Sequence, residues 1–362
     1  MQEIRKLNEL RIGDRWIGEG HPIYFIAEIS ANHDGELERA QVLIRLAAEA
    51  GANAAKFQNF SASKIVSDYG FRALGSQLSH QSKWKKSVFE VYEDAAIAMD
   101  WTPALKSVCD EVGIHYFSSA YDFESVDRLE PHVPAYKIGS GDITWIEIIR
   151  HIAGKAKPVI LASGAATLED VKRAVEEILK INQALILMQC NTNYTARLDN
   201  FNHIHLNVLK TYAALYPDLV LGLSDHTPGH ATVLGAVALG ARVIEKHFTD
   251  DPGRVGPDHA FSMDPGSWRE MVDRTRELER ALGSSMKNVA ENERETVIVQ
   301  QRCLRARRVI RQGEAIDREM IDVLRPAPAE AIRPYDMAKV LGMQALTDIA
   351  AGDALTWEMV GR

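Results

Sequence analysis

Short apolar runs alternate with amphipathic segments along most of the chain. The runs have the length and composition of buried parallel strands, and they occupy residues 23–28, 54–58, 114–118, 135–138, 158–161, 185–190, 220–223 and 243–245. Between them, apolar residues recur at helical spacing, most clearly over residues 36–50, 101–112, 168–181, 231–240 and 265–282. Eight strand–helix units in roughly 260 residues predict an α/β fold closed into a (β/α)8 or TIM barrel.

An open, doubly wound sheet is the alternative arrangement of such units. The first predicted strand is not followed by the G-x-G-x-x-G motif of dinucleotide-binding sheets, which favours the closed barrel. In a closed barrel the last strand neighbours the first. Glu28 should therefore lie beside His247 and two strands from His226.

The pattern changes after the barrel segment. Residues 1–282 are assigned to the barrel with its N-terminal extension, and residues 283–297 are polar and helix-friendly, as expected of a linker. From residue 298 to 362, short β-type runs are separated by glycine and proline, which predicts a small β-rich domain. About sixty residues bury only a marginal core, so packing against a barrel, its own or a neighbour's, is expected.

Charge and cysteine content narrow the classes of function. The formal net charge of the 362 residues is −8, and the longest basic run is Arg305-Ala-Arg-Arg308, so nucleic-acid binding is not indicated. Neither a signal-peptide core nor an apolar stretch long enough for a membrane span is present in the sequence. Three scattered cysteines do not form a disulfide framework. A cytoplasmic protein that binds small molecules and its own copies is expected.

Two histidines follow the last two predicted strands. They stand in Ser224-Asp225-His226-Thr227 and Glu245-Lys246-His247-Phe248. Because a strand–helix–strand unit makes its strands parallel and usually adjacent, both imidazoles should emerge on the carboxyl face. A lone histidine after a strand is usually a core residue, but the ionisable neighbours here would be unfavourable in an apolar core. The pattern favours a divalent metal held by His226 and His247.

Three lysines lie in or just after predicted strands. A lysine in a strand usually extends its stem along a sheet edge, but a closed barrel has no edge. Lys56, Lys137 and Lys246 therefore predict a cluster of positive charge that suits a small, multiply charged anion. The Ser140-Gly141 and Ser163-Gly164 turns could add backbone N–H donors.

Polar loops follow three of the predicted strands and would lie on the same face. They are Asn32-His33-Asp34-Gly35, Thr192-Asn193-Tyr194 and Gly256-Pro257-Asp258-His259. Taken singly, each is most often ordinary turn chemistry. Barrels place their active sites at the carboxyl face of the strands, so together the loops indicate a functional face.

These motifs resemble the N-acetylneuraminate (sialic acid) synthase family nearly from end to end. The similar stretches are Phe25-Ile-Ala-Glu28, Asn32-His-Asp-Gly35, Gly51-Ala-Asn-Ala-Ala-Lys56-Phe-Gln58, Tyr136-Lys-Ile-Gly-Ser140-Gly, Ser224-Asp-His226-Thr, Glu245-Lys-His247-Phe-Thr and Gly256-Pro-Asp258-His. The tail, including Leu324-Arg325-Pro326, is similar to the family's SAF or antifreeze-like domain, a β-clip. The resemblance implies condensation of phosphoenolpyruvate with the open-chain aldehyde of an N-acyl amino sugar, with C–O cleavage, giving a nine-carbon 2-keto acid and phosphate.

The resemblance also implies roles for individual residues. His226 and His247 would hold Mn²⁺ or Mg²⁺, which polarises the sugar aldehyde, and Glu28 would orient or deprotonate the water that attacks C2 of phosphoenolpyruvate. The positions similar to phosphoenolpyruvate-binding residues of the family are Lys56, Lys137, Ser140, Thr192 and Ser224. The positions on the sugar side are Gln58, Asp142, Tyr194, Asp258 and Arg325. Arg325 would reach into the barrel of a partner subunit, which implies a domain-swapped homodimer.

Several residues depart from the family pattern. Asp142 stands where many relatives carry Glu, Gln189 replaces a His before Cys190, and Thr195 follows Tyr194 where Pro is common. Ser119-Ala120 and Ser163-Gly-Ala165 also differ. Several of these changes lie near the sugar or the residues that support its site, so the sequence leaves the acceptor sugar open.

Two alternatives from other classes remain at this point. One is another metal-assisted barrel enzyme, a 3-deoxy-ulosonate synthase acting on a sugar phosphate or a class II aldolase. The other is a non-catalytic sugar-binding protein that keeps the fold. The SAF-like tail argues against the first, and the intact Glu28, Lys56 and histidine pair argue against the second.

Overall fold

The computed structural model describes residues 8–77, 79–195 and 197–362. The chain divides into two compact units, Met1–Gly283 and Ser284–Arg362, and each is described by itself. The beginning of the predicted N-terminal extension, residues 1–7, lies outside the described residues.

The first unit is a closed barrel of eight parallel strands, as the sequence predicts. Each predicted apolar run forms one strand, and hydrogen bonding in the order β10-β3-β4-β5-β6-β7-β8-β9 closes the ring. The strands are β3 (Tyr24–Glu28), β4 (Ala54–Asn59), β5 (His115–Ala120), β6 (Tyr136–Ile138), β7 (Val159–Ala162), β8 (Leu185–Cys190), β9 (Val220–Asp225) and β10 (Ala241–His247). The last strand pairs with the first, and His247 is in register with Glu28.

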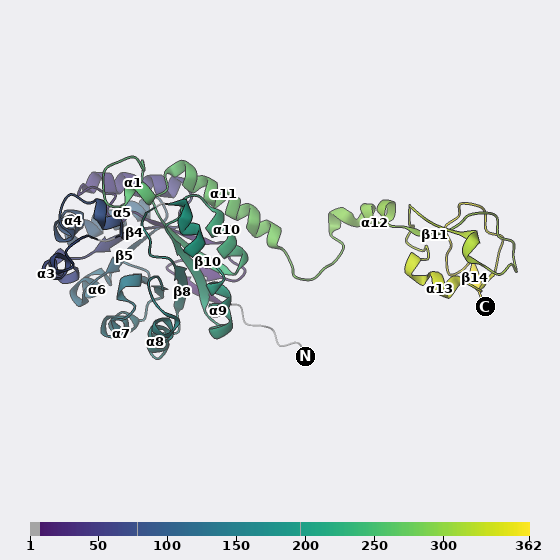
Figure 1. The fold of residues 1–362 in the computed structure, drawn as a ribbon, viewed down its shortest axis with the longest axis horizontal. Helices are drawn as coiled ribbons and strands as arrows, with labels where there is room; N and C mark the ends of the chain where they lie inside the picture. Colours follow the sequence, from purple (N-terminus) through teal and green to yellow (C-terminus); the bar gives the residue numbers. More distant parts are fainter. Residues whose placement is uncertain (1–7, 78, 196) are drawn as a thin grey trace. The chain divides into compact units, whose positions relative to one another are not determined.

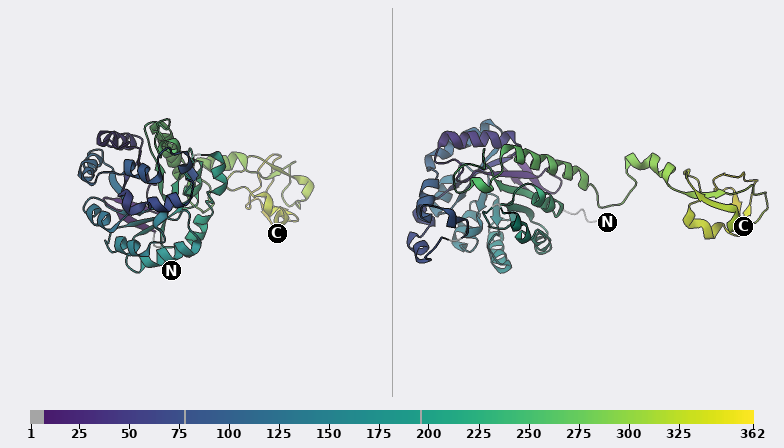
Figure 2. Two further views of the ribbon diagram at one scale, coloured as in Figure 1. Left: turned by 60° about the vertical axis from the view of Figure 1, so that its left-hand side comes forward. Right: turned by 45° about the horizontal axis from the view of Figure 1, so that its top comes forward.

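Helices surround the strands (Figures 1 and 2). The main ones are α1 (Leu37–Glu49), α5 (Thr102–Glu111), α6 (Phe123–Leu129), α7 (Ile146–Ala153), α8 (Leu168–Leu179), α9 (Val208–Leu215), α10 (Ala231–Ala238) and α11 (Pro265–Leu282). Their ends follow local signals. The side chain of Thr167 accepts from the backbone N–H of Asp170 in a capping box before α8, and Asp264 caps α11 ahead of Pro265.

Strand residues alternate between an outer and an inner core. Outward side chains such as Phe25, Leu187 and Ile244 pack with the helices in the larger hydrophobic cluster. Inward side chains form a smaller cluster that fills the amino end of the barrel, and it includes Tyr24, Ile26, Phe117, Ile160, Met188 and Val243. Farther along the same strands the inward residues become polar. The alternation thus leaves one end of the barrel filled and makes the carboxyl end available for chemistry.

A short hairpin closes the filled end of the barrel. It consists of β1 (Glu9–Ile12) and β2 (Arg15–Gly18), which pair in antiparallel fashion. Ile12 and Ile17, both fully buried, belong to the inner cluster. The periodicity of the sequence does not predict this hairpin, because its strands are short and partly exposed.

The longest connection between barrel strands, which we call the β4–β5 excursion, joins β4 to β5 at the carboxyl end of the barrel. Residues 60–101 form a series of short helices before α5 begins. They are α2 (Ala62–Ile65), α3 (Asp68–Ala73), η1 (Ser79–Lys83), α4 (Val88–Ala95) and η2 (Met99–Trp101). Three other 3-10 helices follow strands of the barrel, namely η3 (Ser140–Asp142), η4 (Leu198–His203) and η5 (His259–Phe261).

The second unit is the SAF domain, a small β-rich structure with its own core. Its elements are η6 (Glu291–Glu293), α12 (Arg294–Gln300), β11 (Cys303–Ala306), η7 (Arg318–Met320), β12 (Ile321–Leu324), η8 (Pro334–Asp336), α13 (Met337–Val340), β13 (Gln344–Ala345) and β14 (Val360–Gly361). β11 pairs with β12, and β13 with β14, both antiparallel. Leu304, Ile321 and Leu355 are among its fully buried residues.

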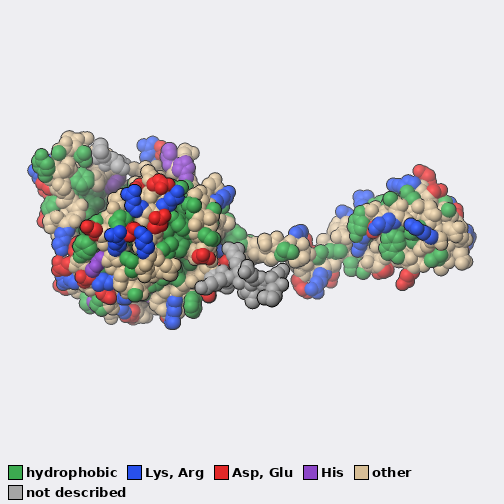
Figure 3. All heavy atoms as spheres, turned by 90° about the horizontal axis from the view of Figure 1, so that it is seen from below, with side chains coloured by type: hydrophobic (Ala, Val, Ile, Leu, Met, Phe, Trp, Pro, Cys, Tyr) green, Lys and Arg blue, Asp and Glu red, His purple; other side chains and the backbone are tan. Residues whose placement is uncertain are grey.

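The molecular surface carries mixed charge. On the face drawn in Figure 3, acidic and basic side chains are interspersed with apolar ones. Many form exposed ion pairs, such as Arg45 with Glu111 on the barrel and Arg308 with Glu314 on the SAF domain. None of the described helices has both the length and the apolar character that crossing a bilayer requires.

Candidate active site

Two imidazoles meet at the carboxyl end of the barrel. His247 ends β10 and His226 directly follows β9, and these two strands are parallel neighbours. The centroids of the two rings are 5.3 Å apart, and both side chains are buried. The strand–helix–strand geometry expected from the sequence thus brings the two histidines together.

The hydrogen bonds of the histidines favour rings with an available lone pair. Nδ1 of His226 lies 2.9 Å from the carbonyl oxygen of Asn191; a carbonyl only accepts, so this nitrogen donates and Nε2 is left as the lone-pair nitrogen. Nδ1 of His247 is buried without a hydrogen-bond partner, and Oδ2 of Asp258 is 3.9 Å away. Burial, with the nearby His226, Lys56 and Lys137, lowers the pKa of His247 well below its usual value and keeps that ring neutral.

Two lysines and two carboxylates form a buried cluster beside the histidines. Nζ of Lys137 lies 2.7 Å from Oε1 of Glu245, and Nζ of Lys56 lies 3.9 Å from the same oxygen. Lys56 also forms an ion pair with Glu28 and lies 3.3 Å from Oγ of Ser119. All four charged side chains are nearly inaccessible to solvent. Such a cluster keeps two ammonium groups inside a protein by compensating each with a carboxylate.

Burial and neighbouring charge shift the pKa values within this cluster. Burial, together with the nearby Lys137 and against the opposing effect of Glu245, lowers the pKa of Lys56 to about 7. For Glu245, burial alone would raise the pKa, but Lys137 and Lys56 hold it below the usual value. The carboxylate of Glu245 is therefore charged at neutral pH, and Lys56 is poised to gain or lose a proton there.

Glu28 lies beside His247, as expected, and its carboxylate pairs with a lysine. It lies in register with His247, yet its carboxylate contacts Lys56, and Nε2 of Gln58 lies 3.4 Å from its Oε1. Glu28 therefore belongs to a lysine–carboxylate pair adjacent to the two histidines.

The expectation that Lys246 joins the positive cluster is wrong. Its ammonium group contacts the carboxylate of Asp225 and the carbonyl of Thr227, and Asp225 also accepts from the hydroxyls of Thr227 and Thr232 at 2.8 Å. Side chains alternate across a strand, so Glu245 and His247 point into the barrel while Lys246 points outward. This outer ion pair ties the ends of β9 and β10 together and thereby supports both histidines.

Three strand-end loops meet around Gly164. Its backbone N–H donates to Oγ of Ser140 at 3.0 Å, and Sγ of Cys190 lies 3.8 Å from Oγ1 of Thr192. A Cβ placed on Gly164 would lie 1.9 Å from Oγ1 of Thr192, which only glycine avoids. The predicted anion-binding residues Ser140 and Thr192 therefore lie side by side, and Oγ of Ser224 approaches Oε1 of Glu245 at 3.4 Å.

A cavity of about 430 Å³ opens over these groups. It includes four of the five residues expected on the sugar side, namely Gln58, Asp142, Tyr194 and Asp258, together with His247, Ser140 and Thr192. Burial raises the pKa of Asp142 to about 6. Seven of the predicted site residues thus line one cleft at the carboxyl end of the barrel.

Aromatic rings connect the histidines to the far side of the cavity. The ring of Tyr194 lies 4.4 Å from that of His226 and 4.9 Å from that of His80, and the His80 ring lies 5.3 Å from that of Trp84. His80 and Trp84 come from the excursion between β4 and β5 and line the cavity. The sequence analysis misses both, because an irregular segment has no periodicity that reports which way its side chains point.

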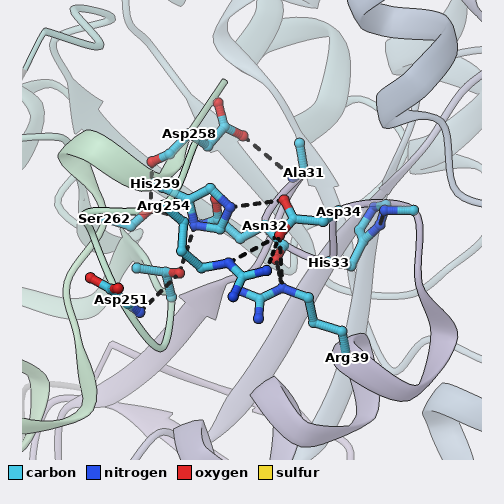
Figure 4. A network of polar contacts seen from close by, with 12 residues as sticks. Ala31, Asn32, His33, Asp34, Arg39, Asp251, Arg254, Asp258, His259 and Ser262 are labelled. Carbon is cyan, nitrogen blue, oxygen red and sulfur yellow. Dashed lines mark hydrogen bonds and ion pairs between the residues drawn. The ribbon is translucent and has the colours of Figure 1, made fainter. Parts of the chain in front are cut away.

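The predicted polar loops after β3 and β10 hold each other in place (Figure 4). Asp34 lies between Arg39, Arg254 and His259, with distances of 3.1 Å, 2.9 Å and 2.9 Å to their nitrogens. Nearby, the backbone N–H of Ala31 lies 3.4 Å from Oδ2 of Asp258, which faces the cavity. This network therefore positions the loop that carries Asp258.

The residues that depart from the family pattern make local contacts of their own. Nε2 of Gln189 donates to the carbonyl of Ile204 at 3.0 Å, and Oγ1 of Thr195 lies 2.6 Å from Oδ1 of Asn193. Ser119 contacts Lys56. These side chains support the strand ends and loops around the cavity.

Arg325 lies in the second unit, where its side chain is exposed. Of the thirteen predicted site residues, it alone comes from outside the barrel unit. Its expected role in a partner's barrel stays a prediction.

Residues 43–287 match the NeuB family, and residues 301–361 match the SAF domain. The chain is 32% identical to human N-acetylneuraminate-9-phosphate synthase, over 96% of this chain and 95% of that protein. It is 31% identical to the N,N'-diacetyllegionaminic acid synthase of Legionella pneumophila, over 99% of each chain. The solved structure of a sialic acid synthetase from Leptospira borgpetersenii aligns with a TM-score of 0.70 and 28% identity, over 80% of this chain and 95% of that one.

Proposed function

The chain belongs to the NeuB family, and we propose that it condenses phosphoenolpyruvate with the open-chain aldehyde of an N-acyl amino sugar. The products are a nonulosonic acid and inorganic phosphate, released by cleavage of the C–O bond of phosphoenolpyruvate. The observation that carries this proposal is the buried cluster of Lys56, Lys137 and Glu245 beside two imidazoles whose ring centroids lie 5.3 Å apart. The relatives named above, which are synthases of sialic-type acids, agree with it.

The lysine cluster suits phosphoenolpyruvate, a small molecule with a phosphate and a carboxylate. Lys56 and Lys137 bring two ammonium groups to one buried place, where a fixed charge attracts an anion more strongly than it does in water. Ser140, Thr192 and Ser224 add hydroxyl donors around the same strand ends. These groups neutralise the phosphate as it departs and hold C3 of phosphoenolpyruvate toward the acceptor.

The two histidines fit a divalent ion such as Mn²⁺ or Mg²⁺. Nδ1 of His247 is buried without a hydrogen-bond partner. In His226, Nδ1 bonds to the carbonyl of Asn191, which leaves Nε2 with a lone pair that can bind a metal. Within the described residues no group of three or more His, Cys, Asp or Glu side chains is arranged to hold a metal, so further ligands would come from substrate or water. Such an ion, when bound, acts as a Lewis acid toward the acceptor aldehyde.

Glu28 and Lys56 are placed for the proton transfers. As C3 of phosphoenolpyruvate bonds to the aldehyde carbon, positive charge develops at C2, and the buried carboxylate of Glu28 favours that charge and orients the attacking water. Its neighbour Lys56, with a pKa of about 7, can share the proton released by the water. Loss of phosphate from the resulting C2 adduct then leaves the keto group.

The acceptor would bind in the adjoining cavity. Gln58, Tyr194, Asp142 and Asp258 line it and offer both donors and acceptors for hydroxyl and acylamino groups. We further propose a domain-swapped homodimer in which the partner's SAF domain completes this cavity with its arginine. The three cysteines are free and buried, which fits the cytoplasmic location that we propose, where phosphoenolpyruvate is made.

Phosphate release is the direct test of the proposal. The protein is incubated with phosphoenolpyruvate, Mn²⁺ and a panel of N-acyl hexosamines that includes diacetamido 6-deoxy sugars. We expect release that requires both the metal and one of the sugars. Formation of pyruvate adducts without phosphate release would instead indicate an aldolase, and sugar binding without any turnover would indicate a non-catalytic protein.

Replacing Gly164 by alanine should raise the KM for phosphoenolpyruvate at least about tenfold. The new Cβ would collide with Thr192 and press on Ser140, so the anion-binding hydroxyls must move. Steady-state kinetics measure the effect. Gly154→Ala is the matched control, since its Cβ would meet only ordinary contacts at 3.4 Å. An unchanged KM in Gly164→Ala would show that this turn does not hold the anion.

Replacing Arg325 by alanine should raise the KM for the sugar about tenfold or more and leave the KM for phosphoenolpyruvate within twofold. The reason is that a guanidinium that contacts only the acceptor sugar does not contribute to phosphoenolpyruvate binding. The exposed Arg311, which pairs with Asp348 in the same domain, gives the control variant Arg311→Ala. An effect confined to phosphoenolpyruvate would contradict the assigned role.

A further inference from the structure

One residue of the active-site cavity has a backbone conformation that its residue type rarely adopts. Ser30 lines the cavity and has a φ of 48°. It is the first central residue of the turn from Ile29 to Asn32, in which the N–H of Asn32 donates to the carbonyl of Ile29 at 2.9 Å. Turns with a positive φ at this position carry mainly glycine, asparagine or aspartate there. A serine therefore carries backbone strain that glycine would avoid.

Contacts with neighbouring strands hold the turn in this conformation. The backbone N–H groups of Ile29 and Ser30 lie 2.8 Å and 3.4 Å from the carbonyl oxygen of Lys56 on β4. The side-chain amide of Asn32 donates to the carbonyl of Phe248 at 2.9 Å. None of these contacts uses the side chain of Ser30, so the same turn can form with glycine in its place.

The hydroxyl of Ser30 is the part of this residue that the fold leaves unused. Ser30 is only 5% exposed, and within the described residues its hydroxyl has no hydrogen-bond partner. The other buried serines in this part of the chain all form side-chain hydrogen bonds, and they are Ser118, Ser119, Ser125, Ser163, Ser224 and Ser262. A strained residue with an unpartnered, buried hydroxyl at a cavity is typical of a ligand-binding position.

The surroundings of Ser30 place this hydroxyl on the acceptor side of the cavity. The turn lies against β4, which carries Gln58 near its end, and the next N–H along the chain, that of Ala31, lies 3.4 Å from Oδ2 of Asp258 (Figure 4). Gln58 and Asp258 line the same cavity and are expected to bind the sugar. The anion-binding hydroxyls, by contrast, follow β6 and β8, and each of these strands is three strands from β3 in the ring.

We propose that the hydroxyl of Ser30 binds a hydroxyl or acylamino group of the acceptor sugar and is a further specificity-determining residue. This inference rests on the proposed function and adds a contact to it. A serine hydroxyl both donates and accepts, so it fits either group of the sugar. The bound acceptor then supplies the hydrogen-bond partner that the fold does not, which explains why a strained serine occupies a position suited to glycine.

Two substitutions of Ser30 separate the hydroxyl from the backbone. Ser30→Ala removes the hydroxyl and keeps the Cβ, whereas Ser30→Gly also relieves the strain. With the panel sugar that gives the fastest phosphate release in the wild type, both variants should raise the sugar KM about fivefold or more. The values of kcat and of the KM for phosphoenolpyruvate should stay within about twofold. The Tm of Ser30→Gly should equal or exceed that of the wild type, which a purely structural role of the serine would not produce.

A second residue with positive φ gives the matched control. Ala156, which follows α7 outside the cavity, is exposed and has a φ of 57°. Ala156→Gly should leave both KM values unchanged.

Three results would overturn the inference and leave the proposed function standing. They are an unchanged sugar KM in either Ser30 variant, an effect confined to phosphoenolpyruvate, and a Tm of Ser30→Gly several degrees below that of the wild type. Absence of phosphate release by the wild type with every sugar would instead overturn the proposed function, and the inference with it.

Discussion

Replacing His247 by alanine should lower kcat by roughly a thousandfold or more, because a Lewis acid that polarises a carbonyl contributes several kcal/mol to catalysis. The side chain is one of two imidazoles whose rings lie 5.3 Å apart, and with one of them gone a single protein ligand would remain. The buried Nδ1 of His247 has no hydrogen-bond partner, so truncation of the side chain costs no hydrogen bond at that atom. The barrel should therefore stay folded by circular dichroism, while calorimetry should show loss of Mn²⁺ binding.

A surface histidine gives the control for this variant. His151 on α7 pairs with Asp127 at the outside of the barrel, and His151→Ala should leave both kcat and Mn²⁺ binding unchanged. Full activity of His247→Ala, or Mn²⁺ binding equal to that of the wild type, would remove the histidine pair from the proposed mechanism.

Replacing Glu245 by glutamine should cause the largest loss of stability among the site variants. Its carboxylate lies 2.7 Å from the ammonium group of Lys137 and 3.9 Å from that of Lys56, and all three groups are buried. Breaking a buried ion pair by removing one partner costs about 3–5 kcal/mol, since the remaining charge has neither water nor a counter-ion. Denaturant unfolding at neutral pH measures this difference.

Ligand addition separates this electrostatic cause from a packing defect. Phosphoenolpyruvate brings negative charge to the same two lysines, so it should raise the Tm of Glu245→Gln by more than that of the wild type. Glu111→Gln is the matched control, because Glu111 pairs with Arg45 at the surface and is 62% exposed. It should change stability little. If Glu245→Gln were as stable as the wild type, the two lysines would not depend on this carboxylate.

The barrel is predictable from the sequence because buried parallel strands leave a strong pattern. Both faces of each strand are covered, so runs such as residues 185–190 and 220–223 are apolar almost without interruption. The hairpin of β1 and β2 is not predictable in this way. Only Ile12 and Ile17 are fully buried there, and two residues do not establish a period.

The site is predictable only as far as strand geometry fixes it. The two histidines, Glu28, Lys56 and Lys137 lie in barrel strands or directly after them, and the closed barrel brings these strands together. The alternation of side chains along a strand also explains why Lys246 lies outside the site. Residues i and i+2 share a face, so Glu245 lies with His247, whereas Lys246 faces outward to Asp225.

The far side of the cavity could not be predicted from the sequence. His80 and Trp84 belong to an irregular segment, and the contact of His80 with Tyr194 joins parts of the chain more than one hundred residues apart. No periodicity in either segment encodes that contact. The lining of this side of the cavity therefore comes from the fold and not from the motifs.

The fate of the bridging oxygen of phosphoenolpyruvate tests the central claim most directly. Phosphoenolpyruvate labelled with oxygen-18 at the C–O–P bridge is turned over with Mn²⁺ and an accepted sugar, and both products are analysed by mass spectrometry. The account predicts the label in inorganic phosphate, together with a nonulosonic acid whose C2 oxygen comes from water. Label retained in the organic product, or pyruvate in place of a nonulosonic acid, would contradict it.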